Sequence, residues 1–549
     1  MMTSAGDRAW PCWSSDLTLS FPWYNVRAMR NLTAVCAIAV SCAVMFGADW
    51  PTDGGNPQRT NWQKDETILR TDNVGNLKIL WKLKFDNAPR QMHSLLPPLI
   101  IGQVGTSTGP KQIALETGVS DNLYAIDVDN GEILWKKHFE YPPPARNGGA
   151  TDPLCPGGLT ATPVIGSADA AGVRTVYALA GNGQLHFINL ATGEETSQPV
   201  QFGYPNGKSY ALNLWNSVIF TTTSQGCAGN PNQMWAMDLN DPLKKVMTFN
   251  PKSGGLWGRT GAAIDSNGVA WAPTGDGTYD LPTQRYGNGL IGAKVEGNEL
   301  NLKDWYIPSN WAFLFKKDLD MQVTPAIFTY KGRELMVVGS KECRVYLLDP
   351  KAAGGGDHQT PLYRTPQLCN EELNFAGTGI WGGMASWEDS KGVRWVLVPF
   401  WGPSHSDFKV PVSYGTVKRG AIVALKVETQ NGKLQLTPAW MSRDMDHAEP
   451  PVVANGVVFA YGSGEDTTQA YAERGLNDSS PLRIKASTHA TLFALDGETG
   501  KELFSSGDQI ASFAHFGGLS VANGRVYLGT YDSVLYSFGL PVASAPAGR

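Results

Sequence analysis

A short motif recurs along the chain and limits the possible folds more than any other feature. It is a strand that ends in Ala-x-Asp and is followed by a glycine turn, and the clearest copy spans residues 123–135. Its alternating residues fit a β-strand, and Asn-Gly or Thr-Gly makes a hairpin turn into the next strand. Progressively weaker copies lie at 492–501, 187–193, 235–238, 346–349, 423–426 and 536–539.

An apolar strand precedes each copy of the motif, for example at 162–165, 324–327 and 451–456. One unit is therefore a small antiparallel sheet that cannot bury both of its faces alone. Stacking such units radially buries the faces and protects the edges. We count eight units, which start near residues 90, 155, 205, 255, 318, 376, 445 and 511.

The last unit lacks one strand, and residues 77–83 can supply it. This pairing would join the two ends of the chain and remove the open sheet edges. The sequence therefore predicts an all-β fold, an eight-bladed β-propeller of four-stranded antiparallel blades over residues 49–540. The remaining residues are predicted to form an N-terminal extension with a signal peptide (1–48) and a flexible tail (541–549).

The composition agrees with many short strands joined by turns. Charged residues make up 17% of the 549, against about 25% in a typical soluble domain, and glycine contributes 61 residues. This composition excludes a disordered protein and argues against a mainly helical one. The net charge of -5 provides no basic surface for nucleic acid, so we expect no nucleic-acid partner.

The N-terminal region contains a candidate export signal. Met29 and Arg30 precede an apolar run at 32–46, which is too short to span a bilayer but suits a signal peptide cleaved near Ala48. A lipoprotein signal at Cys42 and an uncleaved membrane anchor are the alternatives. No later segment is long and apolar enough to span a membrane, so we expect a periplasmic or secreted protein.

Four cysteines remain after the predicted signal: Cys155, Cys227, Cys343 and Cys369. An even number in an exported protein indicates two disulfides. We expect a local Cys343–Cys369 bond and a Cys155–Cys227 bond between neighbouring units, although three pairings are possible. No pair has C-x-x-C spacing and there is no C-x-x-C-H, so neither zinc nor covalent haem is expected.

The motif at 125–135, Ala-x-Asp-x-x-Asn-Gly-x-x-x-Trp, resembles the tryptophan-docking repeat of quinoprotein dehydrogenases. These are eight-bladed propellers that bind pyrroloquinoline quinone (PQQ). The resemblance covers nearly all of the chain after residue 48. It is specific for the fold and weak for activity, because a fold does not determine function. Further segments that look like this family are 49–54 with 73–77, 255–258 with 274–276, and 524–530.

The resemblance implies a site in which a calcium ion acts as Lewis acid, an aspartate as general base and a cationic side chain as partner of the quinone. Asp320 best matches the base and is also a calcium ligand, while Lys341 matches the cation and supports catalysis. Trp257 matches the floor beneath the quinone, and Arg259 could bind an anion. Asp276 replaces the family's metal-binding asparagine. Each residue also has an ordinary structural reading: a turn aspartate, a loop lysine or a core tryptophan.

Other parts of the family's site are missing from the sequence. The expected carboxylate ligand falls near 224–227, where the chain has Gln225 and Cys227 instead. The family's adjacent cysteine pair is reduced to Cys155, and Gly157 and Gly158 replace the expected arginine. A Cys155–Cys227 bond would lie at the mouth of the quinone pocket, and we expect it to remodel that pocket, with exclusion of PQQ as one outcome.

Two classes of function follow from these observations. The first is a quinoprotein-like dehydrogenase that oxidises an alcohol or sugar with PQQ and calcium and passes electrons to a separate acceptor. The second is a non-catalytic propeller that binds a ligand or protein partner at its central face. His447 and His515 precede blade-opening strands and could face the central channel, while the insertion 462–487 is expected to form a surface hairpin or loop, with a lid as the alternative.

Overall fold

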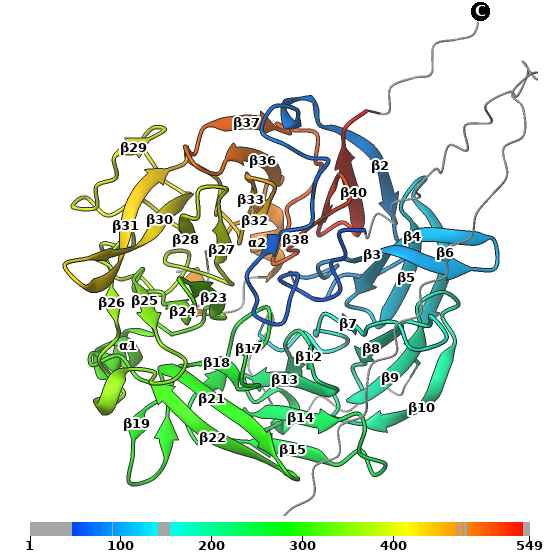
Figure 1. Cartoon of the computed structure of the whole chain (residues 1–549), viewed down its shortest axis with the longest axis horizontal. Helices are drawn as coiled ribbons and strands as arrows, with labels where there is room; N and C mark the ends of the chain where they lie inside the picture. Colours follow the sequence, from blue (N-terminus) through cyan, green and yellow to red (C-terminus); the bar gives the residue numbers. More distant parts are fainter. Residues whose placement is uncertain are drawn as a thin grey trace, which may run out of the picture. The chain divides into compact units, whose positions relative to one another are not determined.

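The repeated motif forms the third strand of a four-stranded antiparallel sheet in each of the seven places where the sequence shows it. Eight such sheets stand around a common axis as the blades of a propeller (Figure 1). This computed structural model describes residues 47–90, 92–140, 154–468, 470–471, 475–476 and 480–541. The chain divides into Met1–Met45 and Phe46–Arg549. The predicted signal at 29–46 and residues 542–549 lie outside the described residues.

Blades 1 to 4 follow one another along the chain, each running from its innermost to its outermost strand. Their strands are β3 (Leu99–Thr106), β4 (Gly109–Gly118), β5 (Asn122–Asp127) and β6 (Glu132–His138); β7 (Val164–Ile165), β8 (Thr175–Leu179), β9 (Gln184–Asn189) and β10 (Glu195–Gln201); β12 (Asn213–Trp215), β13 (Val218–Ser224), β14 (Met234–Asp238) and β15 (Val246–Phe249); β17 (Ala263–Ile264), β18 (Ala270–Gly275), β21 (Gly289–Glu296) and β22 (Glu299–Tyr306).

Blades 5 to 8 repeat this order, except that the outermost strand of blade 8 comes from the beginning of the chain. Their strands are β23 (Ala326–Tyr330), β24 (Arg333–Gly339), β25 (Val345–Leu348) and β26 (Tyr363–Arg364); β27 (Ala385–Glu388), β28 (Arg394–Trp401), β30 (Gly420–Gln430) and β31 (Lys433–Met441); β32 (Val452–Ala454), β33 (Val457–Gly462), β36 (Thr491–Asp496) and β37 (Glu502–Ser505); β38 (Leu519–Ala522), β39 (Arg525–Gly529), β40 (Val534–Gly539) and β2 (Lys78–Lys84).

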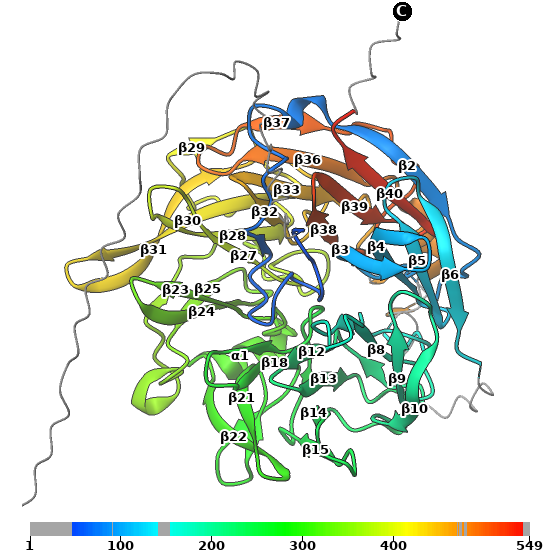
Figure 2. The same cartoon turned by 45° about the vertical axis from the view of Figure 1, so that its right-hand side comes forward.

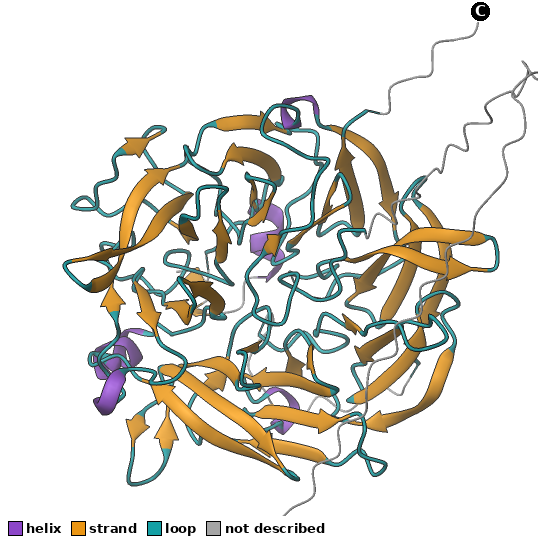
Figure 3. Cartoon of the chain, in the orientation of Figure 1, coloured by secondary structure: helices purple, strands orange, loops and turns teal. Residues whose placement is uncertain are grey.

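Short elements decorate the blades (Figure 3). Among the described residues, no helix is long and apolar enough to cross a membrane. The extra strands are β1 (Trp62–Gln63), β11 (Lys208–Ser209), β16 (Gly255–Leu256), β19 (Tyr279–Asp280), β20 (Arg285–Tyr286), β29 (Val412–Ser413), β34 (Ala470–Tyr471) and β35 (Gly475–Leu476), and the helices are α1 (Trp311–Lys317), α2 (Ser480–Ala486) and the 3-10 turns η1 (Val74–Asn76), η2 (Cys227–Gly229) and η3 (Gly355–Asp357).

The ring closes as the sequence predicts. Strand β2 pairs antiparallel with β40, with Leu83 opposite Leu535 and Lys84 opposite Val534. The first blade-forming strand of the chain thus completes the last blade, and no blade in the ring lacks its fourth strand. The predicted eight-bladed all-β propeller with joined ends is confirmed.

Tryptophans hold neighbouring blades together at the outer side of the ring. Trp135 on β6 donates its indole N–H to the carbonyl of Leu190 in blade 2 at 2.9 Å. Its ring covers Gly193, where a Cβ would lie only 2.7 Å from the indole and φ is +76°. Glycine is therefore required at this turn both for space and for its left-handed backbone. The same arrangement joins Trp81 to Val128 and Gly131, and Trp440 to Gly497 and Gly500.

Apolar side chains fill the spaces between blades rather than one central core. Separate clusters of buried residues join blades 2 and 3, 3 and 4, 4 and 5, 5 and 6, and 6 and 7, and the largest one extends over blades 7, 8, 1 and 2. Burying apolar area contributes about 25 cal/mol per Å². Because every interface is apolar, the axis of the ring is left free for polar groups.

Residues 50–61 line the inside of the ring and bind its blades one after another. The blue segment at the centre of Figures 1 and 2 is this part of the chain. Backbone hydrogen bonds join Trp50 to Ile100, and the carbonyls of the segment accept N–H groups from the innermost strands of five other blades. These pairs are Pro51 with Ile165, Pro57 with Ile264, Gln58 with Ile327, Thr60 with Ser386, and Asn61 with Val453.

The two blades without such a backbone bond are reached through side chains. Asn213 in blade 3 donates its amide to the carbonyl of Pro57 at 2.9 Å. Gln63, just after the segment, donates to the carbonyl of Val521 in blade 8 at 3.3 Å. Strand β1 then continues parallel to β32. The N-terminal segment therefore contacts all eight blades and fills part of the central channel.

Candidate functional site

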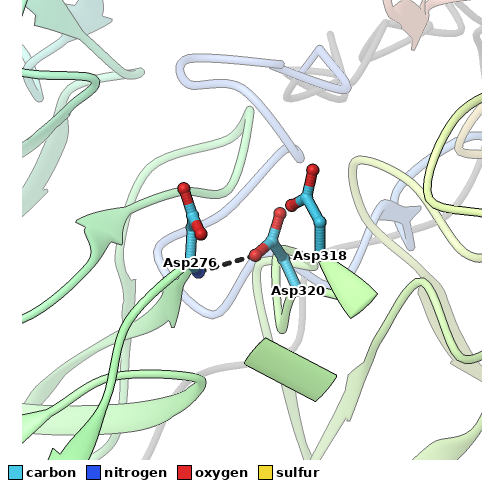
Figure 4. A group of neighbouring side chains, drawn as sticks. All are labelled: Asp276, Asp318 and Asp320. Carbon is cyan, nitrogen blue, oxygen red and sulfur yellow. Dashed lines mark hydrogen bonds between the residues drawn. The ribbon is translucent and has the colours of Figure 1, made fainter. Parts of the chain in front are cut away.

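Three aspartates converge between blade 4 and blade 5 (Figure 4). Asp276 follows β18, Asp318 ends α1, and Asp320 lies shortly before β23. One carboxylate oxygen of each lies within 4.8 Å of the others. Carboxylate oxygens are the donors that hard multivalent cations such as calcium prefer. The arrangement is thus a candidate cation site.

The backbone at this cluster is held in an uncommon conformation. Asp276 and Asp318 both have left-handed backbones, with φ of +48° and +55°. Such conformations cost non-glycine residues free energy and tend to occur at functional sites. The backbone N–H of Asp276 donates to Asp320 at 2.6 Å and to the side chain of Asn288 at 3.0 Å. These bonds fix the orientation of Asp276 and of the buried Asp320.

Lys341 is the cation of the cluster. Its ammonium lies 2.8 Å from a carboxylate oxygen of Asp320 and 3.4 Å from one of Asp318. Its backbone N–H donates to the carbonyl of Asp320 at 3.0 Å, so both groups of Lys341 are directed at the same residue. The ammonium also lies 5.2 Å from the ring centre of Trp381. Lys341 is therefore held by the carboxylates and by an aromatic face together.

The charges of the cluster do not balance. Burial raises the pKa of Asp318 to about 7, although Lys341 opposes that change and Asp320 supports it. Burial and Asp320 also raise the pKa of Asp276. Burial alone would lower the pKa of Lys341, but Asp320 and Asp318 raise it. Three carboxylates face one ammonium, and either protonation of Asp318 or a bound cation would neutralise the surplus negative charge.

A cavity lies next to this cluster, with about 130 Å³ of free space for water-sized molecules. Trp257, Trp381, Trp401 and Tyr210 contribute aromatic walls. Trp257 also packs against Gly275, where a Cβ would meet both the indole at 2.7 Å and Asp320 at 3.0 Å. Trp257 and Trp381 thus border both the cavity and the cluster, and they provide flat apolar surfaces that would suit a conjugated ring system.

Basic groups also line the cavity. Arg259 forms an ion pair with Asp53 at 3.1 Å, so part of its charge is already neutralised. Arg483 on α2 pairs with the buried Glu465, which also contacts Nδ1 of His515 at 2.5 Å. Aromatic walls with basic groups between them fit a flat anionic quinone such as PQQ. Oxygen donors beside the cavity fit its metal ion.

The insertion 462–487 takes part in this cavity. Arg483 is 5% exposed and lines the cavity, and α2 lies over the middle of the ring in Figures 1 and 3. The described part of the insertion is therefore more than a surface loop. Of the two histidines expected near the channel, His515 lines the cavity, while His447 contacts Asp446 at 2.7 Å and Thr467 at 3.1 Å.

Both disulfides have the expected pairing. Cys155 is bonded to Cys227, and their Cα atoms are 5.4 Å apart. Leu154 and Pro156, on either side of Cys155, line the cavity, so this bond borders it as the sequence indicates. Cys343–Cys369 has a Cα separation of 5.3 Å and lies two residues from Lys341.

The structure brings the predicted site residues into one region. Asp276, Asp320 and Lys341 meet at the candidate cation site, and Trp257 and Arg259 line the adjoining cavity. Their predicted roles stay predictions. Asp318 supplies the third carboxylate of the cluster, and no role was predicted for it from the sequence. The spacing Asp-Leu-Asp at 318–320 is the signal that could have identified it.

Lys208, Asp53 and Glu465 also belong to the site, although no role was predicted for them from the sequence. None of them lies in a repeated motif. Lys208 is on β11, which precedes the four core strands of blade 3, and Asp53 is on the N-terminal segment. Glu465 follows the second strand of blade 7. Only the closed ring brings these residues together, so no local pattern indicates them.

No protein-family model matches the chain, and no curated protein matches it in sequence. Solved structures do match. A europium-containing methanol dehydrogenase aligns with a TM-score of 0.57 and 13% identity over 90% of this chain and 98% of that one. The quinohemoprotein alcohol dehydrogenase from Comamonas testosteroni aligns with a TM-score of 0.54 and 12% identity over 91% of this chain and 82% of that one.

The quinohemoprotein alcohol dehydrogenase ADHIIG from Pseudomonas putida HK5 gives nearly the same values, a TM-score of 0.53 and 12% identity over 91% and 82% of the two chains. The chain therefore has the eight-bladed fold of quinoprotein alcohol and methanol dehydrogenases. This confirms the resemblance seen in the sequence. Identities this low show the shared fold alone and leave the activity to be argued from the site.

Proposed function

We propose that the protein is a quinoprotein-like dehydrogenase, which oxidises an alcohol or sugar with PQQ and a hard multivalent cation. The observation that carries the proposal is the convergence of Asp276, Asp318, Asp320 and Lys341 beside a cavity walled by Trp257. The carboxylates there could bind a cation, and the indole of Trp257 could bind a flat ring. Fold-level similarity to alcohol and methanol dehydrogenases supports the proposal, because their sites occupy propellers of this kind.

The three carboxylates would hold the cation, and their number bears on its identity. Calcium is the expected ion, but three carboxylates beside one ammonium provide a surplus of negative charge that also suits a trivalent ion. One matching structure is described as containing europium. We therefore propose a hard oxygen-liganded cation and use both calcium and europium as probes.

Each side chain would contribute a separate step. When bound, the quinone would accept the two electrons that leave the alcohol carbon, and the cation would polarise the quinone carbonyl. Lys341 would hold Asp320 in place and present its ammonium to an oxygen atom of the quinone. Trp257 would bind a flat ring against its indole face and exclude water from one side of it.

The general base is one of two carboxylates. Asp320 is the residue predicted from the sequence, and it is 1% exposed, bonded to Lys341 and to the backbone of Asp276. The Asp318 side chain is 44% exposed, and its contact to Lys341 is the longer of the two, at 3.4 Å. We propose that Asp318 takes the hydroxyl proton, because a base must reach its substrate. Asp320 would then serve to orient the cluster.

The two disulfides support an extracytoplasmic location, because such bonds persist in oxidising compartments. The sequence contains no C-x-x-C-H haem motif, so we propose that the electron acceptor is a separate carrier. A periplasmic or secreted protein that reduces such a carrier is consistent with these features. Release from cells can be checked with antibodies against the full chain.

The direct test of the proposal is europium luminescence of the purified, disulfide-intact protein. We expect one bound europium ion, a longer excited-state lifetime than in buffer because protein oxygens replace water, and displacement by excess calcium. Calorimetry should then show PQQ binding that depends on the cation, and dye-linked assays on alcohols and sugars should detect turnover. Asp276→Asn serves as the matched variant, with weakened cation binding.

A second candidate is a non-catalytic propeller that binds a ligand or partner at its central face. The observation in its favour is that Cys227 occupies the position where the family has a carboxylate, and that its thiol is consumed by a disulfide. If the protein binds neither europium nor calcium, and does not bind PQQ, this candidate is favoured and the dehydrogenase is contradicted.

A further inference from the structure

Lys208 is a basic side chain of the cavity without an acidic partner. It lies on β11 and lines the cavity, with its ammonium 6.0 Å from the ring centre of Trp257. In the part of the chain that the structure describes, no carboxylate forms an ion pair with it. Lys208 and the indole of Trp257 therefore lie together on the lining of the cavity.

The other strong cations near the cavity differ from Lys208 in this respect. Arg259 pairs with Asp53, Arg483 with Glu465, and Lys341 with Asp320. Each of these positive charges thus has a negative one beside it. Lys208 is left as the unbalanced charge of the cavity, and it lies on the wall that carries the flat aromatic surface.

An enclosed ammonium without a partner is costly, because it has lost water and gained no anion. The surroundings of Lys208 support this view. Burial lowers its pKa to about 8, and the half-buried residue lines the cavity. The titratable or charged groups around the same cavity are His93, His515, Arg259, Arg483 and Tyr210. None of them is an acid that could neutralise Lys208.

We propose that Lys208 binds a carboxylate of a flat conjugated ligand that lies against Trp257. The indole face selects a planar ring, the ammonium selects a negative group at the edge of that ring, and Ser209 and Tyr210 add polar groups on the same wall. A carboxylate suits the site because one spare positive charge balances one negative charge. The inference deepens the proposed function and rests on it.

Two molecules could bring such a carboxylate. PQQ carries carboxylates on a flat ring system, and Lys208 would then replace the arginine that the sequence lacks at Gly157 and Gly158. Alternatively, the alcohol that is oxidised could itself carry a carboxylate, as an aromatic hydroxy acid does. The chemistry at Lys208 is the same in both cases, and the experiment must separate the two sources.

The test compares Lys208→Met with Lys208→Arg, because methionine keeps the length of the side chain and arginine keeps its charge. Calorimetry of the europium-loaded protein would measure PQQ, PQQ trimethyl ester, benzoate and benzamide. A charge-assisted hydrogen bond contributes enough that we expect Lys208→Met to lose about 10- to 100-fold in affinity for the carboxylate ligand. Lys208→Arg should keep most of that affinity, and the uncharged ester or amide should bind weakly to all forms.

The source of the carboxylate follows from which ligand responds. If only PQQ binding weakens in Lys208→Met, the carboxylate belongs to the cofactor; if only benzoate binding weakens, it belongs to the substrate. Europium luminescence of the same variants should remain as in the unmodified protein, because Lys208 is not among the cation ligands. Unchanged binding of both PQQ and benzoate by Lys208→Met would overturn the inference while leaving the cation site intact. Loss of europium binding by the unmodified protein would instead count against the proposed function.

Discussion

The outer side of the ring and its central channel are held together in different ways. At the outer side, Trp135 on one blade covers Gly193 on the next, and both residues belong to the same kind of local motif. In the channel, Lys341 meets Asp320, and Arg259 meets Asp53 from more than 200 residues away. The outer contacts repeat around the ring, whereas the central contacts occur once each.

This difference separates what stabilises the propeller from what could give it a function. Apolar packing keeps the blades in contact at every interface, and docked tryptophans reinforce three of these interfaces. The central groups instead carry buried charges, which are costly unless they are paired. We therefore expect substitutions at the two places to affect different measurements, one mainly stability and the other mainly binding.

The largest effect on stability should come from Trp135→Ala. Loss of the indole and of its hydrogen bond to Leu190 should lower the free energy of unfolding by about 3 kcal/mol. Denaturant unfolding followed by circular dichroism would measure it. Trp135→Phe should recover most of that loss, and Leu243→Ala, at a residue 87% exposed, should change little. Weakened europium binding by folded Trp135→Ala would contradict the separation of the two regions.

Asp320→Asn should weaken cation binding more than it lowers stability, which is the reverse of the effect expected for Trp135→Ala. Removing one carboxylate charge from the cluster should weaken europium binding by about 100-fold. The amide keeps the size of the side chain and an acceptor for the N–H of Asp276, and Asp318 remains beside the ammonium of Lys341, so the free energy of unfolding should fall less than in Trp135→Ala. A luminescence titration of the variant gives the affinity. If Asp320→Asn binds europium as tightly as the unmodified protein, the three aspartates are not the cation site.

Glu449 links the stability of the channel to pH. Burial and the charge of Glu465 raise the pKa of the Glu449 carboxyl from its usual 4.5 to about 8, although the charge of Arg259 opposes this change. The native state then keeps a proton that the unfolded state releases between these two values, so stability should fall as pH rises from about 5 to 8. Glu449→Gln should remove on the order of 2 kcal/mol of this decline, measured by denaturant unfolding at pH 5, 6.5 and 8. If stability falls with pH in Glu449→Gln as it does in the unmodified protein, Glu449 is ionised in the native state.

The smallest effect should come from the exposed ion pair between Lys391 and Glu498, which joins blades 6 and 7 at the surface. Solvent screens such pairs, so Lys391→Met should change the free energy of unfolding by less than about 0.5 kcal/mol. A larger change would mean that polar contacts at the outer side matter as much as the tryptophans do. Thermal unfolding at low and high salt would separate the two cases.

The fold could be predicted from the sequence because its signals are local. The strand, the Ala-x-Asp and the glycine turn lie within about a dozen residues, and all eight units begin a few residues before their first strand. The closing strand at 77–83 was also predicted, since its alternation matched the missing place in blade 8. Each of these inferences needs only neighbouring residues and the rule that sheet edges must be paired.

The site could be predicted only where a family motif indicated it. Asp276, Asp320, Lys341 and Trp257 were named from such positions, and the structure brings them together. Lys208 could not be found in this way, because its proposed role depends on which other cations of the cavity have acidic partners in the closed ring. Residue spacing along the chain does not contain that information, and it becomes visible only when every cation of the cavity can be matched to an anion.

The segment 50–61 has a consequence for how the molecule comes apart. Repeat proteins in which each unit contacts only its neighbours can lose units from one end at a time. Here this segment, together with Gln63 just after it, is bonded to all eight blades, and its contacts to the last blades can form only after those blades have been synthesised. We expect hydrogen exchange to show one cooperative transition for the innermost strands, so that loss of any blade opens the whole ring.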